Sequence, residues 1–489
     1  MKKKIVLRIF SALLCASLIF AISGCGQKTT ISEIVVVEDE DSSNSGASAS
    51  ETQSGSTTVK KNPSKKNNNT KISMMDVGTK GANGKDYSNY NPYSGIEKFN
   101  GTTVKFATWI DHTQTEGAVP LANFERDTGL KVELFTVAQS GYVSKLQSSI
   151  ASGDIPDVFV SNEGDQNFPL TMQFAAPINK VSTVDLKEPI WDQSMLATAT
   201  IDGNVYLVNT IGSPWSGSNL CYYNKSLFEE NGFTTPAEYY EQGNWTWATM
   251  KKVMKDVKSL GDDYAGGMVD VEILGDSAGV SFVMYDYKTA TFKSGVNTKE
   301  LLATYQWYAD AREEGLLGGT FKKFTEGKCG IVTTGVYGLK ATGHFKDMDP
   351  NDIGFTFLPS LEDGTASKTS SIYRMYGIIA GCKNANAAGY FIRYWLDPKN
   401  YDIDNTFVTI EAGNFYYTLT NKTADEKYFN YDDAVCTLIG SGSSGVFING
   451  AMGASSAQVK TKLDEVSNKV DQAVAEANKI ITDLKNANK

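Results

Sequence analysis

The chain has 489 residues, more than one hydrophobic core usually serves, so we expect two domains or a two-lobed body. Its formal net charge is −10, and its only histidines are His112 and His344. The acidic balance disfavours nucleic acid or anionic lipid as a partner, and two distant histidines offer little material for a zinc site or a Ser-His-Asp triad.

Residues 1–24 have the pattern of a secretory signal peptide. Lys2, Lys3, Lys4 and Arg8 form a basic start, and the apolar stretch 9–22 follows. That stretch is short for a membrane-spanning helix. Without this segment, which holds four basic and no acidic residues, the net charge is −14 (−10 − 4).

The signal-like segment ends in I-S-G-C, residues 22–25, which resembles the bacterial lipobox. We therefore expect Cys25 to carry a diacylglycerol and an acyl chain such as palmitate, an anchor stabilised by about 0.8 kcal/mol per buried methylene. An ordinary secretory signal with an incidental cysteine is the alternative.

Residues 25–100 contain serine-, asparagine- and lysine-rich runs and few apolar residues. Such a composition does not form a core, so we predict that this segment is a disordered tether. A coil of that length spans roughly 50 Å.

Strand and helix patterns alternate from residue 103 onward. Strands are predicted over 103–109, 130–137 and 155–160, and helices over 118–128 and 142–152, with Gly129 and Gly153 as terminators. This alternation with short loops favours a parallel sheet with right-handed crossovers. Asp202-Gly203 then predicts a hairpin turn.

A break at Gly212-Ser213-Pro214 precedes a strand that ends near residue 223. Ser226 and Glu229 have capping-box spacing, so a short helix is predicted to begin there and to stop at Gly232.

Trp245 and Trp247 are two residues apart, so in a helix they point to different sides, and we expect one to be buried and one exposed. A strand is predicted over 330–333, followed by a glycine loop and Tyr337. The stretch 373–380 looks like a return crossing into the first lobe, and a helix over 391–396 follows. The 4-3 repeat of apolar residues over 459–484 indicates either a coiled-coil seam or, as we favour, a helix packed on its own domain.

The sequence contains no pattern typical of catalysis, a metal or a cofactor. Cys221, Cys329, Cys382 and Cys436 allow one disulfide, two or none, and none forms a Cys-x-x-Cys pair. The pair at 327–328 is not a phosphate loop, because the upstream glycine and the following Ser or Thr are missing. No carboxylate spacing marks a glycosidase pair.

Four stretches, in the same order, resemble extracellular solute-binding proteins of family 1, the maltose-binding-protein-like sugar receptors of ABC importers. They are F-E-R-D-T-G-L-K-V at 124–132, G-D-I-P-D-V at 153–158, Y-N-K-S-L-F-E-E-N-G at 223–232 and F-T-E-G-K-C-G-I-V-T-T-G-V-Y at 324–337. The resemblance covers about residues 102–459. An insertion at 237–243 and Tyr337 in place of the usual tryptophan are departures.

The resemblance implies an α/β fold of the two-lobed, periplasmic-binding-protein-like type II. In that fold each lobe is a mixed, mainly parallel sheet flanked by helices, and a hinge of several crossings joins the lobes. We expect the first lobe over 101–212 and about 373–400. The second lobe is expected over 213–372 and about 401–489, including the C-terminal helix.

The resemblance also places the ligand in the interlobe cleft, where the carboxyl ends of the strands meet. The matching ligand-binding candidates are Trp109, Asp111, His112, Ser161, Asn162, Glu163, Asp165, Trp215, Tyr337, Arg374 and Tyr376. For Trp215, packing in a core is an equally good interpretation. Flat rings against the apolar faces of sugars and planar polar groups for their hydroxyls suit a carbohydrate.

The implied function is that of a monomeric receptor, lipid-anchored on the extracellular side of the membrane of a single-membrane bacterium. It is expected to bind a carbohydrate, an oligosaccharide, and to deliver it to the transmembrane subunits of an ABC permease. The ATPase of that permease is a separate cytoplasmic chain. Alternatives are a ligand sensor for a membrane receptor kinase and a surface glycoside-active enzyme.

Overall fold

The computed structural model describes residues 78–139, 141–162, 169–362, 365–401, 406–441 and 443–487. The predicted signal peptide, Cys25 and the predicted tether as far as residue 77 lie outside the described residues. Among the helices of the described part, none is long and apolar enough to cross a membrane.

Residues 78–100 are ordered against the body, although the sequence places them in the tether. They form turns and the 3-10 helix η1, Ile96–Phe99. The backbone N–H of Ala82 donates to the carbonyl of Lys187 at 2.9 Å, and the Tyr87 hydroxyl donates to Asp185 at 2.7 Å. The predicted tether is thus too long at this end, because aromatic side chains among its polar residues reach the first lobe.

The first strands and helices agree with the sequence pattern, except that the third strand lies at Val158–Asn162 and not at the predicted 155–160. β1 pairs in parallel with both β2 and β3, and the two helices end at glycines in the left-handed region, with φ of 72° at Gly129 and 85° at Gly153. The elements are β1 Thr103–Thr108, η2 His112–Gln114, α2 Ala118–Thr128, β2 Lys131–Thr136, α3 Tyr142–Ser152 and β3 Val158–Asn162.

Short elements connect β3 to the second half of the molecule. They are η3 Leu170–Phe174, β4 Ala175–Ala176, η4 Ile178–Lys180, α4 Gln193–Thr198, β5 Thr200–Ile201 and β6 Asn204–Val205. β5 and β6 form an antiparallel hairpin whose turn residues, Asp202 and Gly203, have φ of 50° and 73°. Both positive angles fit the Asp-Gly turn that the sequence predicts.

β7 organises the second half because its two faces pack into two different hydrophobic cores. Leu220 and Tyr222 belong to one hydrophobic cluster, and Cys221 and Tyr223 belong to a second. The elements are β7 Ser216–Asn224, α5 Lys225–Asn231, α6 Pro236–Glu241, α7 Trp247–Lys258, β8 Ala265–Met268, α8 Val271–Ser277, β9 Val283–Asp286, β10 Thr291–Ser294, α9 Lys299–Glu313, α10 Phe321–Thr325, β11 Cys329–Gly335, η5 Val336–Leu339, η6 Pro350–Asp352 and β12 Ile353–Thr356.

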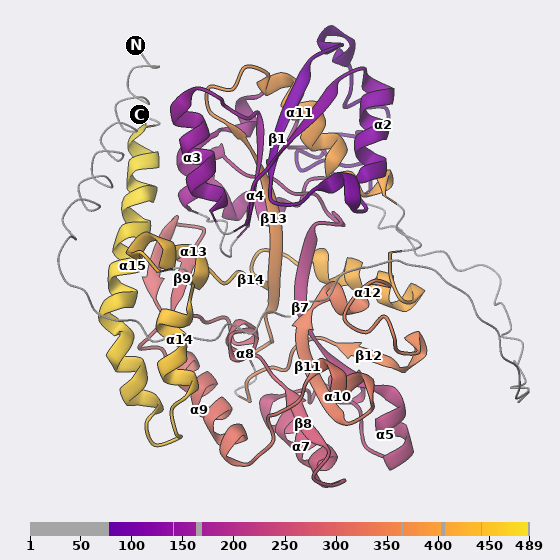
Figure 1. The fold of residues 1–489 in the computed structure, drawn as a ribbon, viewed down its shortest axis with the longest axis vertical. Helices are drawn as coiled ribbons and strands as arrows, with labels where there is room; N and C mark the ends of the chain where they lie inside the picture. The colour runs from indigo at the N-terminus through magenta and orange to yellow at the C-terminus, as the bar shows by residue number, and fades with distance from the viewer. Residues whose placement is uncertain are drawn as a thin grey trace, which may run out of the picture. The chain divides into compact units, whose positions relative to one another are not determined.

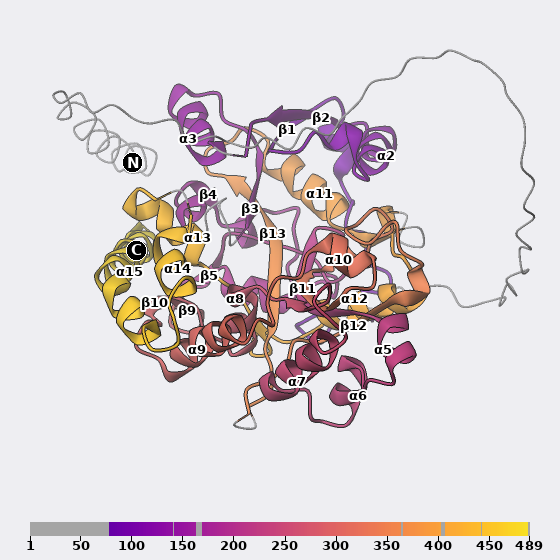
Figure 2. The same ribbon diagram turned by 60° about the horizontal axis from the view of Figure 1, so that its bottom comes forward.

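β13, Thr369–Ile379, is a long strand that joins the two halves into one sheet. Its first part pairs antiparallel with β7 and its second part pairs antiparallel with β3, and partners change between Tyr373 and Arg374. The main sheet order is β2-β1-β3-β13-β7-β11-β8. In Figures 1 and 2 β13 runs from the first strands toward the second half.

The C-terminal segment covers both halves. α11 packs on α2 and β1, beneath the first strands in Figure 2. The elements are α11 Ala385–Trp395, η7 Pro398–Asn400, α12 Ile410–Thr420, β14 Lys427–Tyr428, α13 Asp432–Cys436, η8 Thr437–Ile439, α14 Gly445–Met452 and α15 Val459–Ala487. α15 buries every apolar position of its 4-3 repeat against α14, α9 and β10, which confirms the packed helix.

Two local predictions are wrong. The N-cap of α5 is Asn224, whose side chain accepts from the N–H of Leu227 at 3.0 Å. Ser226 instead donates to Asp352 at 2.6 Å, so it is not available to cap the helix. The predicted stop at Gly232 is confirmed.

The tryptophans at 245 and 247 are both buried, contrary to the expectation of one exposed ring. α7 begins only at Trp247, so the 100° rotation of a helix does not separate the two side chains. Trp245 donates its Nε1–H to the carbonyl of Phe357 at 2.9 Å, and Trp247 packs against Trp307. The four cysteines at 221, 329, 382 and 436 are free.

Candidate functional site

Trp109 is the residue that the first lobe contributes to the candidate site. It directly follows β1, at the carboxyl edge of the parallel strands, and is half-buried. Its indole meets the ring of Tyr142 edge to face, with centroids 5.2 Å apart. Because Tyr142 is fixed by a 3.0 Å hydrogen bond from its hydroxyl to the carbonyl of Ala107, the Trp109 ring has a rigid support.

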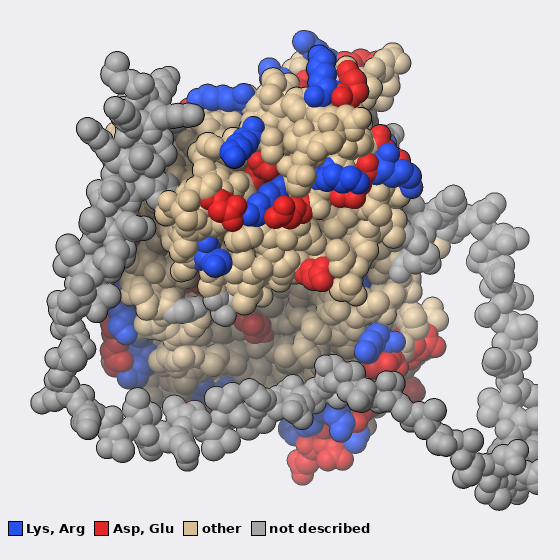
Figure 3. All heavy atoms as spheres, turned by 45° about the horizontal axis from the view of Figure 1, so that its top comes forward, with Lys and Arg blue, Asp and Glu red and all other residues tan. Residues whose placement is uncertain are grey.

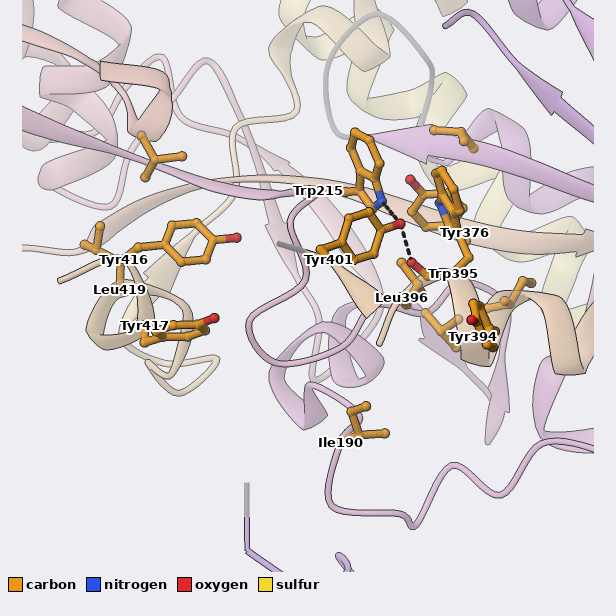
Figure 4. Close-up of a cluster of buried hydrophobic side chains, with 14 of the residues drawn as sticks. Ile190, Trp215, Tyr376, Tyr394, Trp395, Leu396, Tyr401, Tyr416, Tyr417 and Leu419 are labelled. Atoms are coloured by element: carbon orange, nitrogen blue, oxygen red, sulfur yellow. Dashed lines mark hydrogen bonds between the residues drawn. The ribbon is translucent and has the colours of Figure 1, made fainter. Parts of the chain in front are cut away.

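Trp215 enters the site from the residue before β7. Its ring lies parallel to that of Trp395, with centroids 5.3 Å apart, and 7% of it is exposed. Its Nε1–H donates to the Tyr401 hydroxyl at 3.1 Å, and that hydroxyl donates to the carbonyl of Trp395 at 2.7 Å (Figure 4). Of its two interpretations, the structure therefore favours core packing, with the guanidinium of Arg374 over its ring.

Arg374 lies where β13 changes partners. Its guanidinium carbon is 5.7 Å from the ring centroid of Trp109 and 5.6 Å from that of Trp215, so one cation contacts two indoles. Its backbone N–H donates to the carbonyl of Trp215 at 3.2 Å, and the Asn209 amide donates to its carbonyl at 2.9 Å. Within the described residues, no hydrogen bond or ion pair engages the guanidinium.

His112 lies beneath these rings and is 1% exposed. It stacks on Phe106 and meets Trp215 and Trp395 edge to face. Burial, reinforced by the positive charge of Arg374, lowers the pKa of His112 to about 3, so the imidazole is neutral at physiological pH. In this conformation it supports the site from below.

Asp111 is exposed, and its carboxylate is occupied locally. It accepts from the backbone N–H of Thr113 at 3.0 Å and from the Thr113 hydroxyl at 2.6 Å, which caps η2. The side-chain and backbone hydrogen bonds from Thr113 lower the pKa of Asp111.

The candidates after β3 are only partly described. Ser161 is buried, and its hydroxyl lies 2.8 Å from that of Thr171. The backbone of Asn162 pairs with Arg374 in the sheet, which places this end of β3 beside the site. Glu163 and Asp165 lie outside the described residues.

Tyr376 is fully buried two residues beyond Arg374. Its hydroxyl and the Nε1–H of Trp395 have no hydrogen-bond partner among the described residues. Burial raises the pKa of Tyr376 well above its usual range.

Tyr337 is not brought together with the indoles. It lies in η5, is 45% exposed, and donates its hydroxyl to the carbonyl of Thr342 at 2.8 Å. Its ring meets His344 edge to face, and His344 stacks on Phe321. This aromatic group forms a separate exposed surface of the second half.

Sequence reasoning missed the residue that connects this surface to the site. Lys340 directly follows η5 and lies 3.6 Å from the carboxylate of Glu116, in the loop after η2. Burial lowers the pKa of Lys340, Glu116 opposes the shift, and the charge of Arg374 adds to it. No motif marks Lys340 or Glu116, because their pairing depends on two loops 224 residues apart in sequence (340 − 116).

A separate cavity of about 350 Å³ lies between the ordered segment that starts at residue 78 and the body. Tyr87, Tyr90 and Tyr417 line it together with Arg393 and Glu188. It contains none of the predicted ligand-binding residues, and Arg393 is already paired with Glu188 at 3.0 Å. We therefore place the candidate site at the indoles.

The face in Figure 3 carries charges of both signs around a hollow whose visible walls are mostly uncharged. Mixed charge of this kind gives no broad field for a polyanion or polycation. Among the described residues, no group of three His, Cys, Asp or Glu is arranged to hold a metal ion.

The family model of the bacterial extracellular solute-binding proteins matches residues 121–403 of the sequence, which is more than half of the chain. The chain belongs to this family. Its members are binding proteins, so the alternative of a glycoside-active enzyme is wrong, and the family predicted from the four motifs is confirmed.

Solved structures of other solute-binding proteins have the same fold. The cyclic α-maltosyl-1,6-maltose binding protein of Arthrobacter globiformis is 16% identical with a TM-score of 0.53, and the match covers 79% of this chain and 100% of that chain. The sugar-binding protein MalE of Xanthomonas citri is 16% identical with a TM-score of 0.58, over 78% and 99%.

UgpB of Mycobacterium tuberculosis, solved with glycerophosphocholine, is 14% identical with a TM-score of 0.55, over 76% and 99%. No protein with a curated description matches the chain. At these identities the likeness shows the fold, which is the two-lobed, periplasmic-binding-protein-like type II fold that the sequence predicts.

Proposed function

We propose that this solute-binding protein is a lipid-anchored extracellular receptor that binds a carbohydrate, an oligosaccharide, and delivers it to an ABC permease. The observation that carries the proposal is the contact of the Arg374 guanidinium with Trp109 and Trp215. An indole offers a flat face to the apolar C–H surface of a pyranose, and a guanidinium offers planar donors to its oxygens.

Residues from both halves converge at this point. Trp109 follows a strand of the first half, Trp215 precedes β7 of the second half, and Arg374 lies on the strand that both halves share. A ligand held by Trp109 and Arg374, with Trp215 supporting the guanidinium, gains contacts that depend on the relative position of the halves. Such a ligand stabilises the closed arrangement, which is the basis of hinge closure.

We propose the lobes with the predicted boundaries, 101–212 with about 373–400 and 213–372 with about 401–489. The pair between Lys340 and Glu116 supports a closing contact, because it joins the loop after β11 to the loop after η2. The predicted contacts of Asp111, His112, Ser161, Asn162, Glu163, Asp165, Tyr337 and Tyr376 with ligand remain predictions.

The solved structures support a carbohydrate ligand for this chain. The Arthrobacter protein binds cyclic α-maltosyl-1,6-maltose, and the GacH receptor of Streptomyces glaucescens is solved in complex with acarbose. The glycerophosphocholine of UgpB is the counterexample among them, so the test includes solutes that are not sugars.

Isothermal titration calorimetry of the purified protein with mono- and oligosaccharides tests the ligand class. We expect micromolar or tighter binding of at least one oligosaccharide, recovered unchanged after the titration. Absence of binding across the sugars together with binding of a peptide or a glycerophosphodiester would contradict the carbohydrate proposal.

The lipid anchor and the permease are tested in the producing cell. We expect Cys25 to carry the diacylglycerol, so Cys25→Ser should release the protein from the membrane and prevent metabolic labelling with a palmitate analogue. If mass spectrometry finds an unmodified N-terminus on the protein in the membrane fraction, the lipid anchor is contradicted. Uptake of the bound sugar should be lost with the protein if it serves a permease rather than a sensor kinase.

A further inference from the structure

We propose that the ligand carries an anionic group, a carboxylate or a phosphate ester, and that Arg374 binds that group. The inference rests on the proposed carbohydrate function and names the chemical class of the sugar. It starts from the state of the Arg374 side chain, which differs from that of every other described arginine.

The other three described arginines all have polar partners. Arg126 bonds to Asp127 and Asn123, Arg312 donates to the carbonyls of Met452 and Ala454, and Arg393 pairs with Glu188 and Asp397. Arg374 alone has only rings beside it within the described residues. A half-buried guanidinium without hydrogen bonds is costly, and a bound acceptor removes that cost.

The contacts with the rings leave the donors of Arg374 free. A cation over an aromatic face is held by the ring quadrupole, which does not use the N–H groups in the guanidinium plane. Those five donors form a rigid fork that matches a carboxylate or phosphate in a bidentate geometry. Because Trp109 rests on Tyr142 and Trp215 on Trp395, the fork is supported on two fixed surfaces.

The charge around Arg374 is also unbalanced. Lys340 is close enough for the charge of Arg374 to lower its pKa, and Glu116 is the carboxylate paired with Lys340 at 3.6 Å. His112 is neutral, and the carboxylate of Asp111 is bonded to Thr113. Two cations thus share one carboxylate among the described groups, and an anionic ligand group restores the balance.

A neutral hydroxyl meets this requirement less well. It accepts a charge-assisted hydrogen bond from Arg374 but leaves the charge of the guanidinium uncompensated, whereas a carboxylate or phosphate accepts two parallel hydrogen bonds and also pairs with that charge. We therefore expect acidic sugars to bind at least about tenfold tighter than their neutral counterparts, a difference of about 1.4 kcal/mol.

Calorimetry with matched sugars tests the inference. The carboxylate arm compares xylobiose with xylobiose bearing a glucuronic acid, and galactobiose with digalacturonate. The phosphate arm compares trehalose with trehalose 6-phosphate. We expect tighter binding of the acid in one arm, which identifies the anionic group, and a weaker affinity as salt concentration rises because charge contributes.

Arg374→Gln keeps a planar amide but removes the charge. It should weaken binding of the acidic sugar by about tenfold to a hundredfold and that of its neutral partner by less than about threefold. Arg126→Gln removes the same charge from the exposed surface of α2, where the side chain is 67% exposed, and should leave both affinities unchanged. Circular dichroism and the unfolding midpoint establish that each variant is folded, and Arg374→Met, which also removes the charge, replaces the Gln variant if it is not.

The outcomes separate the two proposals. Equal affinity for acidic and neutral sugars, or equal losses for both in Arg374→Gln, would overturn the inference and leave a carbohydrate receptor. If no sugar binds but citrate or inorganic phosphate does, and Arg374→Gln abolishes that binding, the anion site stands and the carbohydrate proposal fails. No binding of any probe overturns both.

Discussion

The two parts of β13 differ in what they bury. In the first part, Ser370 accepts from the amide of Asn219 at 2.7 Å and donates to Asp276 at 2.5 Å, and Asn430 also donates to Asp276 at 3.1 Å. In the second part, Tyr376 joins an aromatic cluster with Phe106 and the rings beneath Trp215. A polar network and an aromatic cluster thus share one strand.

The difference shows how a strand can combine structure with recognition. The carboxyl group of Asp276 has its partners within the protein, so the polar part joins α8 and the C-terminal segment to the sheet. The aromatic part is apolar except at its edge, where Arg374 meets Trp109 and Trp215 without a polar partner among the described residues. A satisfied buried group serves stability, and an unsatisfied one at an edge is available to a ligand.

The largest expected effect comes from removing the support of the aromatic part. Trp395→Ala deletes the ring that stacks on Trp215 and lies against Phe391, and it leaves a large cavity. We expect the free energy of unfolding to fall by about 3–5 kcal/mol, measured by denaturant titration. Tyr240→Ala, at a ring that is 45% exposed, is the control and should change stability by less than about 1 kcal/mol.

A loss below about 1 kcal/mol in Trp395→Ala would mean that the indole pair is not a rigid support. The claim that the aromatic part of β13 belongs to a rigid cluster would then be wrong.

Removing the ring at the edge should affect binding rather than folding. Trp109→Ala deletes a half-buried indole beside Arg374, and we expect the Kd for the bound sugar to rise by about tenfold to a hundredfold, with stability little changed. Tyr337→Ala, in the separate aromatic surface, should weaken binding by a smaller factor. Calorimetry on the two variants decides between them, and unchanged affinity in both would place the ligand elsewhere.

The polar part should make stability depend on pH. Burial raises the pKa of Asp276 to about 8, while Ser370 and Asn430 oppose the shift, against 3.8 for the unfolded chain. The folded state therefore retains a proton that the unfolded state loses between about pH 4 and pH 8. Stability is highest below that window, falls as pH rises through it and levels off above it, by at most about 1.4 kcal/mol per pH unit.

Asp276→Asn removes this titration, so the variant should lose less stability than the parent between pH 5 and pH 8. Glu272 and Asp432, whose pKa values burial raises to about 9 and about 7, contribute to the slope in both proteins. The difference between the two proteins reports Asp276 together with its coupling to Glu272, whose pKa the charge of Asp276 also raises. Thermal unfolding across that range measures it. Parallel curves for parent and variant would show that Asp276 is ionised when folded.

The smallest expected effect concerns Asp111. Because its carboxylate caps η2 through Thr113, Asp111→Ala should cost about 1 kcal/mol of stability and leave sugar affinity within about threefold of the parent. A large loss of affinity without a loss of stability would instead establish Asp111 as a ligand contact.

Local patterns predicted much of the fold. The bounds of α2 and α3 and the stops at Gly129, Gly153 and Gly232 follow from apolar periodicity and from the left-handed conformation that glycine adopts. The predicted N-cap of α5, Ser226, is wrong because Asn224 and Ser226 are both residue types that cap helices. Only the hydrogen bond of Ser226 to the distant Asp352 decides between them.

The site was less accessible to sequence. Motif positions and the predicted hinge make Trp109, Trp215 and Arg374 candidates, but they do not indicate that His112 and Tyr376 are buried beside them, since burial depends on α11 packing from residues 385–395. Lys340 and Trp395 were missed for the same reason. Their contacts join segments far apart in the chain, and no spacing within one segment encodes them.

The most direct test of the central claim is fluorine NMR of protein labelled with 5-fluorotryptophan, titrated with the sugar that binds best. Trp109→Phe and Trp215→Phe assign the two resonances among the seven tryptophans. We predict that sugar shifts the Trp109 and Trp215 signals, while that of Trp247, buried in the second core, stays in place. Saturating sugar that leaves both signals unmoved would contradict a carbohydrate site at Arg374.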